Sequence, residues 1–254
     1  MLYGLYLSAT GVITSAYRQD LIANNMANSE TVGFKRDLAT FQQRPAADQE
    51  NPLSAQFGSS LLDKIGGGIL ASPTQIDTSQ GTIEPDGNNM DAAIMGSGYF
   101  QVATADGQTR LTRDGRFKID QSSRLALSNS QASPLLDTQG RTINLDPTLP
   151  TRIDIAGHVL QAEQPVAQLA VVDAPDPTKL KKDGGSLLSY SDPTALTPSQ
   201  SQVEDGALEH SNVDPATELT ALMDTQRQLE ANANMIHYQD EMMGDLVNTV
   251  GKIS

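Results

Sequence analysis

The stretch from residue 211 to residue 250 limits the possible folds more than any other part of the chain. Asp214 is a favourable helix N-cap, and Pro215 suits the first helical position, where its missing N–H is not needed. No further proline follows, and Gly244 is the only glycine before Val250. The stretch therefore predicts one helix roughly 50 Å long, at ~1.5 Å per residue. A helix of that length needs a long partner, because a small core cannot cover it.

Positions spaced alternately by three and four residues run through this predicted helix and indicate packing along another helix. They are Leu219, Leu222, Gln226, Leu229, Ala233, Ile236, Asp240, Met243, Val247 and Val250. The N-terminus repeats the spacing at Leu2, Leu5, Ala9, Val12, Ala16, Gln19, Ala23 and Met26. Either stripe alone fits an ordinary amphipathic helix that covers a globular core. The two matched stripes together favour a coiled-coil stalk that brings the chain ends together.

Between the two predicted helices the pattern is that of short β-strands separated by turns. Asp106-Gly107 and Asp114-Gly115 are strong turn signals. Strands are predicted at 99–104, 109–113, 116–120, 141–145, 152–155, 159–161 and 166–173. The last of these is the most apolar and is expected in the middle of a sheet. Many short strands with regular turns favour a sandwich or an open barrel over βαβ units.

The predicted fold class is therefore α+β, with N- and C-terminal helices paired as a coiled-coil stalk and a central, mainly antiparallel β domain. Residues 1–41 and 208–254 are predicted to form a terminal helical rod domain. Residues 42–68 read as a linker or hinge, because they contain two prolines and end in three glycines. Residues 69–207 are predicted to form the β domain.

Charge and composition exclude several classes of function. The net charge of −14 and the pI near 4.4 argue against nonspecific binding of nucleic acid or an anionic membrane. No segment approaches ~20 consecutive apolar residues, so direct membrane insertion is not expected. The first residues lack the basic start and the unbroken apolar run of a cleavable signal peptide. Export, if it occurs, is expected by another route.

No combination of residues supports a reaction. The chain has no cysteine, and its three histidines, His158, His210 and His237, lie in different predicted elements. His237 and Glu241 are four residues apart on the C-terminal helix, but two ligands do not make a metal site. We therefore predict no catalytic, cofactor-binding or metal-binding residues, and we expect a protein that is not an enzyme.

Three motifs, in order along the chain, resemble the axial proteins of the bacterial flagellum, specifically the rod and hook family. The first is the segment Asn24-Asn25-Met26-Ala27-Asn28, followed by Thr31, Gly33, Phe34 and Lys35, with Met26 where leucine is usual. The second runs from Gly98-Tyr99-Phe100 through Thr112-Arg113-Asp114-Gly115 to Phe117 and Asp120, although Ser122-Ser123 replaces a common glycine turn. The third begins at Leu208-Glu209 and continues through Ser211-Asn212-Val213-Asp214 to Glu230 and Asn232.

The resemblance implies a mechanical function. Paired terminal helices would form the inner tube of a helical assembly, with the β domain outside it. The chain would be a segment of a drive shaft that transmits torque in bacterial motility and leaves a central channel. It implies export without a cleaved signal peptide by the flagellar type III apparatus. It further implies localisation in the periplasm-spanning rod of the basal body, and contacts with itself and with other flagellar rod and hook proteins.

The residues predicted to form the assembly interface come from both stripes. They are Leu5, Ala9, Val12, Ala16, Ala23, Met26, Leu219, Leu222, Leu229, Ala233, Ile236, Met243 and Val247. Open-ended assembly needs head-to-tail contacts that do not close. The alternative is a secreted binding or adhesion module, carried on a helical stalk, that uses the same helices to form a closed oligomer.

Overall fold

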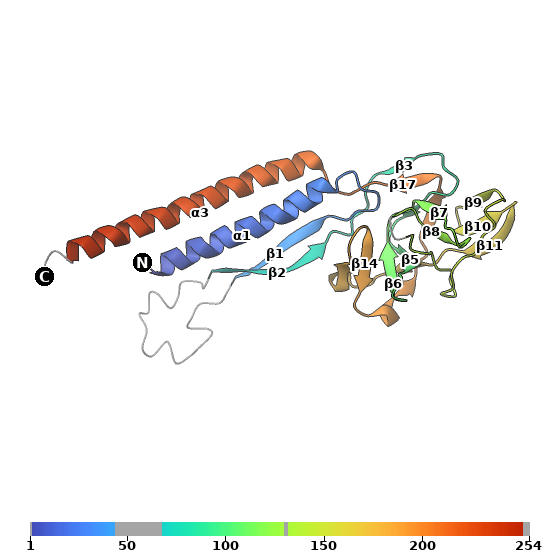
Figure 1. The fold of residues 1–254 in the computed structure, drawn as a ribbon, viewed down its shortest axis with the longest axis horizontal. Helices are drawn as coiled ribbons and strands as arrows, with labels where there is room; N and C mark the ends of the chain where they lie inside the picture. The colour runs from blue at the N-terminus through green and yellow to red at the C-terminus, as the bar shows by residue number, and fades with distance from the viewer. Residues whose placement is uncertain (1, 44–67, 130–131, 251–254) are drawn as a thin grey trace. The chain divides into compact units, whose positions relative to one another are not determined.

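The structure is a computed structural model that describes residues 2–43, 68–129 and 132–250, and it divides into two compact units. Unit 1 comprises residues 1–26, 37–74 and 215–254, and unit 2 comprises residues 27–36 and 75–214. Terminal helices and many antiparallel strands make the fold α+β, as predicted (Figure 1). The units do not follow the predicted domain limits, because 27–36 and 208–214 group with the strands. The predicted linker, 42–68, lies almost wholly outside the described residues.

Unit 1 is built from two long helices and a two-stranded ribbon. Helix α1 spans Leu2–Ala27 and helix α3 spans Pro215–Val250, close to the limits predicted from the sequence. The helices lie side by side and run in opposite directions, so that the start of α1 and the end of α3 lie toward the same end of the pair (Figure 1). Neither helix is long and apolar enough, within the residues described, to cross a membrane.

Glycines of α1 allow the two helices to approach closely. A Cβ atom built on Gly11 would lie 2.7 Å from Nδ2 and 2.8 Å from Cγ of Asn232. One built on Gly4 would lie 2.8 Å from Nε2 of Gln239. In both helices these positions are seven residues apart, which is the repeat of a helix pair in continuous contact.

The less exposed face of α3 follows the same repeat, and we call it the inner seam. It consists of Glu218, Leu222, Thr225, Leu229, Asn232, Ile236, Gln239 and Met243. Leucine, isoleucine and methionine thus alternate with polar residues. Polar residues at such positions lower stability but restrict the register between helices.

Replacing Gly11 with alanine tests the close approach of the helices. Alanine favours a helix interior by up to ~1 kcal/mol over glycine. The clash with Asn232 costs about 1–3 kcal/mol, as overpacking usually does. We therefore expect Gly11→Ala to lower the free energy of unfolding of unit 1, measured by circular dichroism in urea. In an Asn232→Ala background the same change should be neutral or stabilising. If the effects of the two substitutions on the free energy of unfolding were strictly additive, that result would contradict the close contact between Gly11 and Asn232.

The ribbon of unit 1 pairs β1, Asp37–Gln43, with β2, Ile69–Ile76. A cavity of about 160 Å³ is lined by residues from α1, β1, β2 and α3, so the ribbon lies next to the helices. The buried side chain of Asn25, in α1, fixes the start of β1. It donates to the carbonyl of Asp37 at 3.0 Å and accepts from the N–H of Asp37 at 2.9 Å. This pair of hydrogen bonds gives Asn25, in the first motif, a structural role.

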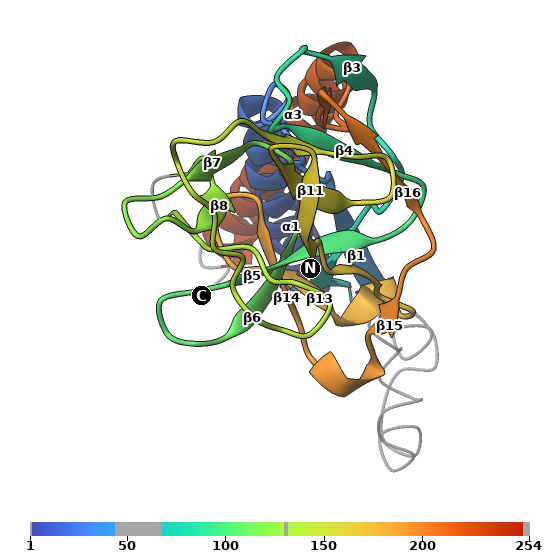
Figure 2. The ribbon, with the colours of Figure 1, turned by 90° about the vertical axis from the view of Figure 1, so that its right-hand side faces the viewer.

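Unit 2 contains the remaining strands, arranged in small sheets (Figure 2). The largest has the order β13-β14-β6-β5-β12-β15, and a three-stranded sheet has the order β11-β10-β9. Pairs β16-β4, β17-β3 and β7-β8 complete the described part of the unit, and all of these strand pairings are antiparallel. The strands are β3 Ile83–Pro85, β4 Ala92–Met95, β5 Tyr99–Ala103, β6 Thr109–Thr112, β7 Phe117–Ile119, β8 Leu125–Leu127, β9 Thr151–Ile153, β10 His158–Gln161, β11 Gln164–Gln168, β12 Val171–Asp173, β13 Leu180–Lys182, β14 Leu187–Tyr190, β15 Thr197–Pro198, β16 Gln202–Asp205 and β17 Ala207–Glu209. Short 3₁₀ turns occupy Pro177–Lys179 and Pro193–Ala195.

Successive side chains of a strand point to opposite faces of its sheet. Apolar clusters cover both faces of the six-stranded sheet. Phe100 belongs to the larger core cluster, where its ring meets that of Phe117 edge-on at 5.2 Å. The neighbouring Tyr99 belongs to a second cluster with Leu111 and Tyr190. Unit 2 therefore has two apolar layers rather than one core.

The sequence predicts that the apolar run 166–173 forms one central strand, and this prediction is wrong. It is divided between β11, at the edge of the three-stranded sheet, and β12, in the six-stranded sheet. Leu169 and Ala170 lie between them and are buried. Their N–H groups donate to the carbonyls of Gly157 and Leu136. The buried part of the run is where the chain passes from one sheet to the other, whereas Val166, in β11, is 48% exposed.

A turn motif repeats every 17 residues in unit 2, at Asp120, Asp137 and Asp154. Each carboxylate accepts the backbone N–H of the residues two and four positions later. It also pairs with the side chain of the latter residue, which is Arg124, Arg141 or His158. The residue three positions later has a positive φ: 58° at Ser123, 75° at Gly140 and 75° at Gly157. Ser123 thus occupies the place of the expected glycine without changing the turn.

Candidate functional site

A buried group of three charged side chains lies at the meeting point of the three sequence motifs, and we call it the ion-pair centre. Lys35 comes from the first motif, Arg113 from the second and Glu209 from the third. Nζ of Lys35 lies 2.6 Å from Oε1 of Glu209, and Nη1 of Arg113 lies 2.7 Å from Oε2. The three side chains are only 1–2% exposed.

Backbone groups add further hydrogen bonds to the ion-pair centre. Lys35 Nζ donates to the carbonyl of Ser79 at 2.7 Å, and Arg113 Nη2 donates to the carbonyl of Gly96 at 2.6 Å. The N–H of Gly81 donates to Glu209 Oε1 at 3.0 Å. The Arg113 guanidinium also lies 5.2 Å from the centroid of the Tyr99 ring. Burial lowers the pKa of Lys35, although the carboxylate of Glu209 favours its charged form.

Two glycines permit the close packing around this centre. Gly33 has φ of 69°, and a Cβ there would lie 2.3 Å from the backbone N of Asp114. At Gly115 a Cβ would lie 1.7 Å from the carbonyl oxygen of Ala92. No other residue type fits either position without moving the backbone. This explains glycine in both the Gly-Phe-Lys and the Thr-Arg-Asp-Gly segments.

Asn212, in the third motif, holds the segment that carries Lys35. Its Oδ1 accepts the N–H of Arg36 at 2.8 Å, and its Nδ2 donates to the carbonyls of Asp77 and Ser79, each at 3.1 Å. The first and third motifs are therefore joined by side-chain-to-backbone bonds as well as by charge. The centre can hold chain segments together, but it offers no exposed reactive group.

A carboxyl pair lies elsewhere in unit 2, near the start of β4. The pKa of Asp91 is raised to about 6, first by burial and then by its hydrogen bond to the carboxylate of Asp86. Asp91 is only 5% exposed, and its Oδ1 accepts the N–H of Phe117 at 3.4 Å. The pKa of Asp86 is lowered, first by the same hydrogen bond with Asp91.

The raised pKa of Asp91 predicts a pH-dependent stability. The folded protein holds this proton at pH values where the unfolded chain has released it, so stability falls as pH rises from about 4 to about 6. Asp91→Asn should remove that slope and should be on the order of 2 kcal/mol more stable than the unchanged chain at pH 7. Urea unfolding at about pH 4.5, 6 and 7.5 measures the free energy of unfolding and its change with pH. Asp106→Asn, in an exposed turn, is the control and should leave the slope intact.

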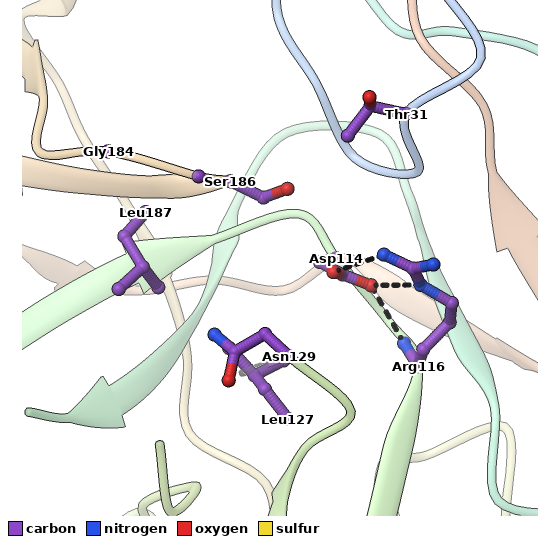
Figure 3. A pocket seen from close by; sticks show the side chains of 9 residues that line it. Thr31, Asp114, Arg116, Leu127, Asn129, Gly184, Ser186 and Leu187 are labelled. Atoms are coloured by element: carbon purple, nitrogen blue, oxygen red, sulfur yellow. Dashed lines mark hydrogen bonds and ion pairs between the residues drawn. The ribbon is translucent and has the colours of Figure 1, made fainter. Parts of the chain in front are cut away.

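A cavity of about 330 Å³ opens beside the Asp114–Arg116 ion pair (Figure 3). Arg116 donates from Nε to Oδ1 of Asp114 at 3.0 Å and from Nη2 to Oδ2 at 2.9 Å. Thr31, Asn129 and Ser186 are among the other lining residues, and the nine that line it include neither histidine nor cysteine. Among the described residues, no three His, Cys, Asp or Glu side chains are placed to share a metal ion.

The predicted assembly residues divide between half-buried and exposed positions. Half-buried residues on α1 are Leu5, Ala9, Val12, Ala16 and Met26, and on α3 they are Leu222, Leu229, Ile236 and Met243. Exposed residues are Ala23, Leu219, Ala233 and Val247, of which Val247 is 68% exposed. The half-buried residues of α3 lie on the inner seam, whereas the exposed ones lie beside it.

The sequence prediction missed a second apolar row on α3, which we call the outer stripe. It consists of Met235, Tyr238, Met242 and Leu246, at spacings of three, four and four residues, and each is between 48% and 62% exposed. On α1, Tyr6 and Ile13 are also exposed, by 42% and 66%, and are seven residues apart. The spacing signal for both rows is present in the sequence.

Comparison with known families finds three matches, in order along the chain. Residues 5–35 match the flagella basal body rod protein model, and residues 93–160 match the flagellar hook protein FlgE/F/G D1 domain. Residues 204–249 match the flagellar basal body rod FlgEFG protein C-terminal model. The first match contains Lys35, the second Arg113 and the third Glu209. All three members of the ion-pair centre thus fall in matched segments.

Curated relatives are similar over nearly the whole chain. The flagellar basal-body rod protein FlgF of Caulobacter vibrioides is 32% identical, over 98% of this chain and 98% of the relative. The flagellar basal-body rod protein FlgG of Bacillus subtilis is 31% identical, over 98% and 99%. The flagellar hook-basal body complex protein FlhP of Bacillus subtilis is 28% identical, over 96% and 98%.

Proposed function

Because the chain belongs to the flagellar basal-body rod protein family, we propose that it is a structural subunit of the flagellar basal-body rod, which self-assembles into a hollow helical tube that transmits torque. The observation that carries the proposal is the similarity to rod proteins along the full length of both chains. A partial match would leave room for another function on a shared domain. Here the helices, the β unit and the ion-pair centre all lie within the similar region.

The proposal gives each unit a mechanical part. The α1–α3 pair acts as an antiparallel coiled coil, a reading supported by the seven-residue repeat of Gly4 and Gly11 against Gln239 and Asn232. Unit 2 acts as a rigid β sandwich, a reading supported by the two apolar layers on the six-stranded sheet. The ion-pair centre fixes the residues just after α1 to the strand just before α3.

Charge supports contact between different faces of neighbouring subunits. Helix α3 contains six acidic residues and one arginine, whereas α1 contains one arginine and one aspartate. Two α3 faces would repel one another, but the outer stripe of α3 can meet the neutral, apolar face of α1 that carries Tyr6 and Ile13. Such a contact joins unlike surfaces, so it can repeat without closing.

The remaining parts of the proposal follow from the family. The partners are other copies of this chain and other flagellar rod and hook proteins, and the location is the basal body. The route there is the flagellar type III export apparatus, without a cleaved signal peptide. The chain has no enzymatic role in this proposal. Between FlgF and FlgG we favour FlgF, because the turn Lys181-Lys182-Asp183-Gly184 and the following Leu187-Leu188-Ser189 resemble that relative more.

Limited proteolysis across a concentration series tests the proposal. Helices that are covered on assembly should become resistant as the concentration of the full chain rises, whereas unit 2 should be resistant throughout. Cleavage sites mapped by mass spectrometry distinguish the two units. Helices that are fully resistant in the most dilute sample would show that they need no neighbour, and would count against assembly through them.

A further inference from the structure

Among the described residues, the most exposed methionines are concentrated on α3. The chain has no cysteine and no tryptophan, so its eight methionines are its most easily oxidised side chains. Among the described residues, four methionines are about half exposed, and three of these lie on α3: Met223, Met235 and Met242, at 47%, 51% and 54%. The fourth is Met95, in unit 2, at 48%.

Two of the three methionines on α3 lie on the surface proposed for assembly, and Met223 lies outside it on the same helix. Met235 and Met242 are seven residues apart and belong to the outer stripe with Tyr238. Met243, the next residue, lies on the inner seam and is half-buried. Oxidation is favoured where the thioether is accessible, so the outer stripe is open to it while the chain is unassembled.

We propose that Met223, Met235 and Met242 form an oxidation-sensitive modification site that controls association, an inference that rests on the proposed function. A peroxide transfers one oxygen atom to the thioether sulfur, which loses two electrons. The O–O bond of the peroxide breaks, and hydrogen peroxide leaves as water. The product, methionine sulfoxide, is polar, so an apolar contact row becomes a polar one.

The chemistry predicts reversibility and selectivity. Methionine sulfoxide reductases return the sulfoxide to the thioether, so association should recover after their addition. Met90 packs against the main core of unit 2 and should be oxidised last. The fold of unit 2 should be unaffected at the stage where the three α3 methionines are modified.

The experiment treats the full chain with hydrogen peroxide and follows two readouts. Peptide mass spectrometry gives the sulfoxide fraction at each methionine, and light scattering gives the concentration at which association begins. We expect Met223, Met235 and Met242 to oxidise well before Met90, and the onset concentration to rise roughly tenfold or more, which corresponds to the loss of a few apolar contacts.

Two variants provide the controls. In Met223→Leu/Met235→Leu/Met242→Leu the ratio of the onset concentrations with and without peroxide should fall to near one, whatever the starting association of that variant. Met95→Leu removes an equally exposed methionine in unit 2 and should leave the full response.

The outcomes separate this inference from the proposed function. A chain that associates equally well after its α3 methionines are oxidised would overturn the inference alone, as would a triple variant that keeps the full response. A chain that does not associate before treatment would overturn the proposed function and the inference with it.

Discussion

Replacing Glu209 with glutamine lowers the free energy of unfolding of unit 2 by about 3–5 kcal/mol, the usual cost of removing one partner from a buried ion pair. The substitution preserves shape but leaves Lys35 and Arg113 as two buried cations with no anion between them. Their mutual repulsion and their lost hydration both oppose folding. Urea unfolding, followed by circular dichroism, measures the change.

The matched control for this prediction is Glu84→Gln, on the strand that pairs with β17. The side chain of Glu84 is 64% exposed and lies 3.5 Å from Nε2 of His210. An exposed pair of this kind contributes about 0–1 kcal/mol, so the control should unfold close to the unchanged chain. If Glu209→Gln unfolded at the same urea concentration as Glu84→Gln, the ion-pair centre would not be what holds the three motifs together.

Replacing Tyr238 and Met242 together with aspartate should raise the concentration at which the chain associates by about 100-fold or more. Both side chains are more than half exposed, so the folded monomer loses little. An assembled neighbour, however, would have to bury two carboxylates where it buried two large apolar groups, which costs several kcal/mol. Light scattering against concentration measures the change.

The control here is Asn234→Asp, which adds a carboxylate to an exposed position of the same helix without removing apolar area. It should shift the onset of association only slightly. Unit 2 should melt at the same temperature in all three proteins. Normal association of the double variant would show that neighbours do not use the outer stripe.

The sequence predicts the two helices well because their signals are local. Proline at position 215 marks the start of α3, and the asparagines after Ala23 mark the end of α1. The face that α3 turns toward α1 is harder to predict. Polar residues occupy half of the inner seam, and a search for apolar residues passes over three of them, Thr225, Asn232 and Gln239, in favour of their exposed neighbours.

The strands are predicted less completely, because their environment depends on distant parts of the chain. Arg141–Leu145 alternates like a strand, but only isolated bridges form there, at Thr142 and Asn144. The run 166–173 enters two different sheets in turn, with Val166 exposed in β11 and Val172 buried in β12. A local pattern records burial and does not record which sheet provides it.

The ion-pair centre could not be assembled from the sequence alone. Lys35 and Glu209 are 174 residues apart, and no spacing rule joins them. Each lies in a motif that the sequence analysis singled out, so the residues could be noticed but not paired. Their pairing depends on β17 lying beside β3, and on Gly33 allowing the chain to pass over Asp114.

The molecular mass of the full chain as a function of concentration tests the central claim most directly. Multi-angle light scattering over a hundredfold range of concentration, about the span that an open equilibrium needs, gives the mass at each point. Assembly through unlike helix faces predicts a mass that rises continuously and reaches no plateau. A single fixed mass, kept over the whole range, would mean a closed oligomer. That result would contradict the rod assembly and would favour a binding module carried on a helical stalk.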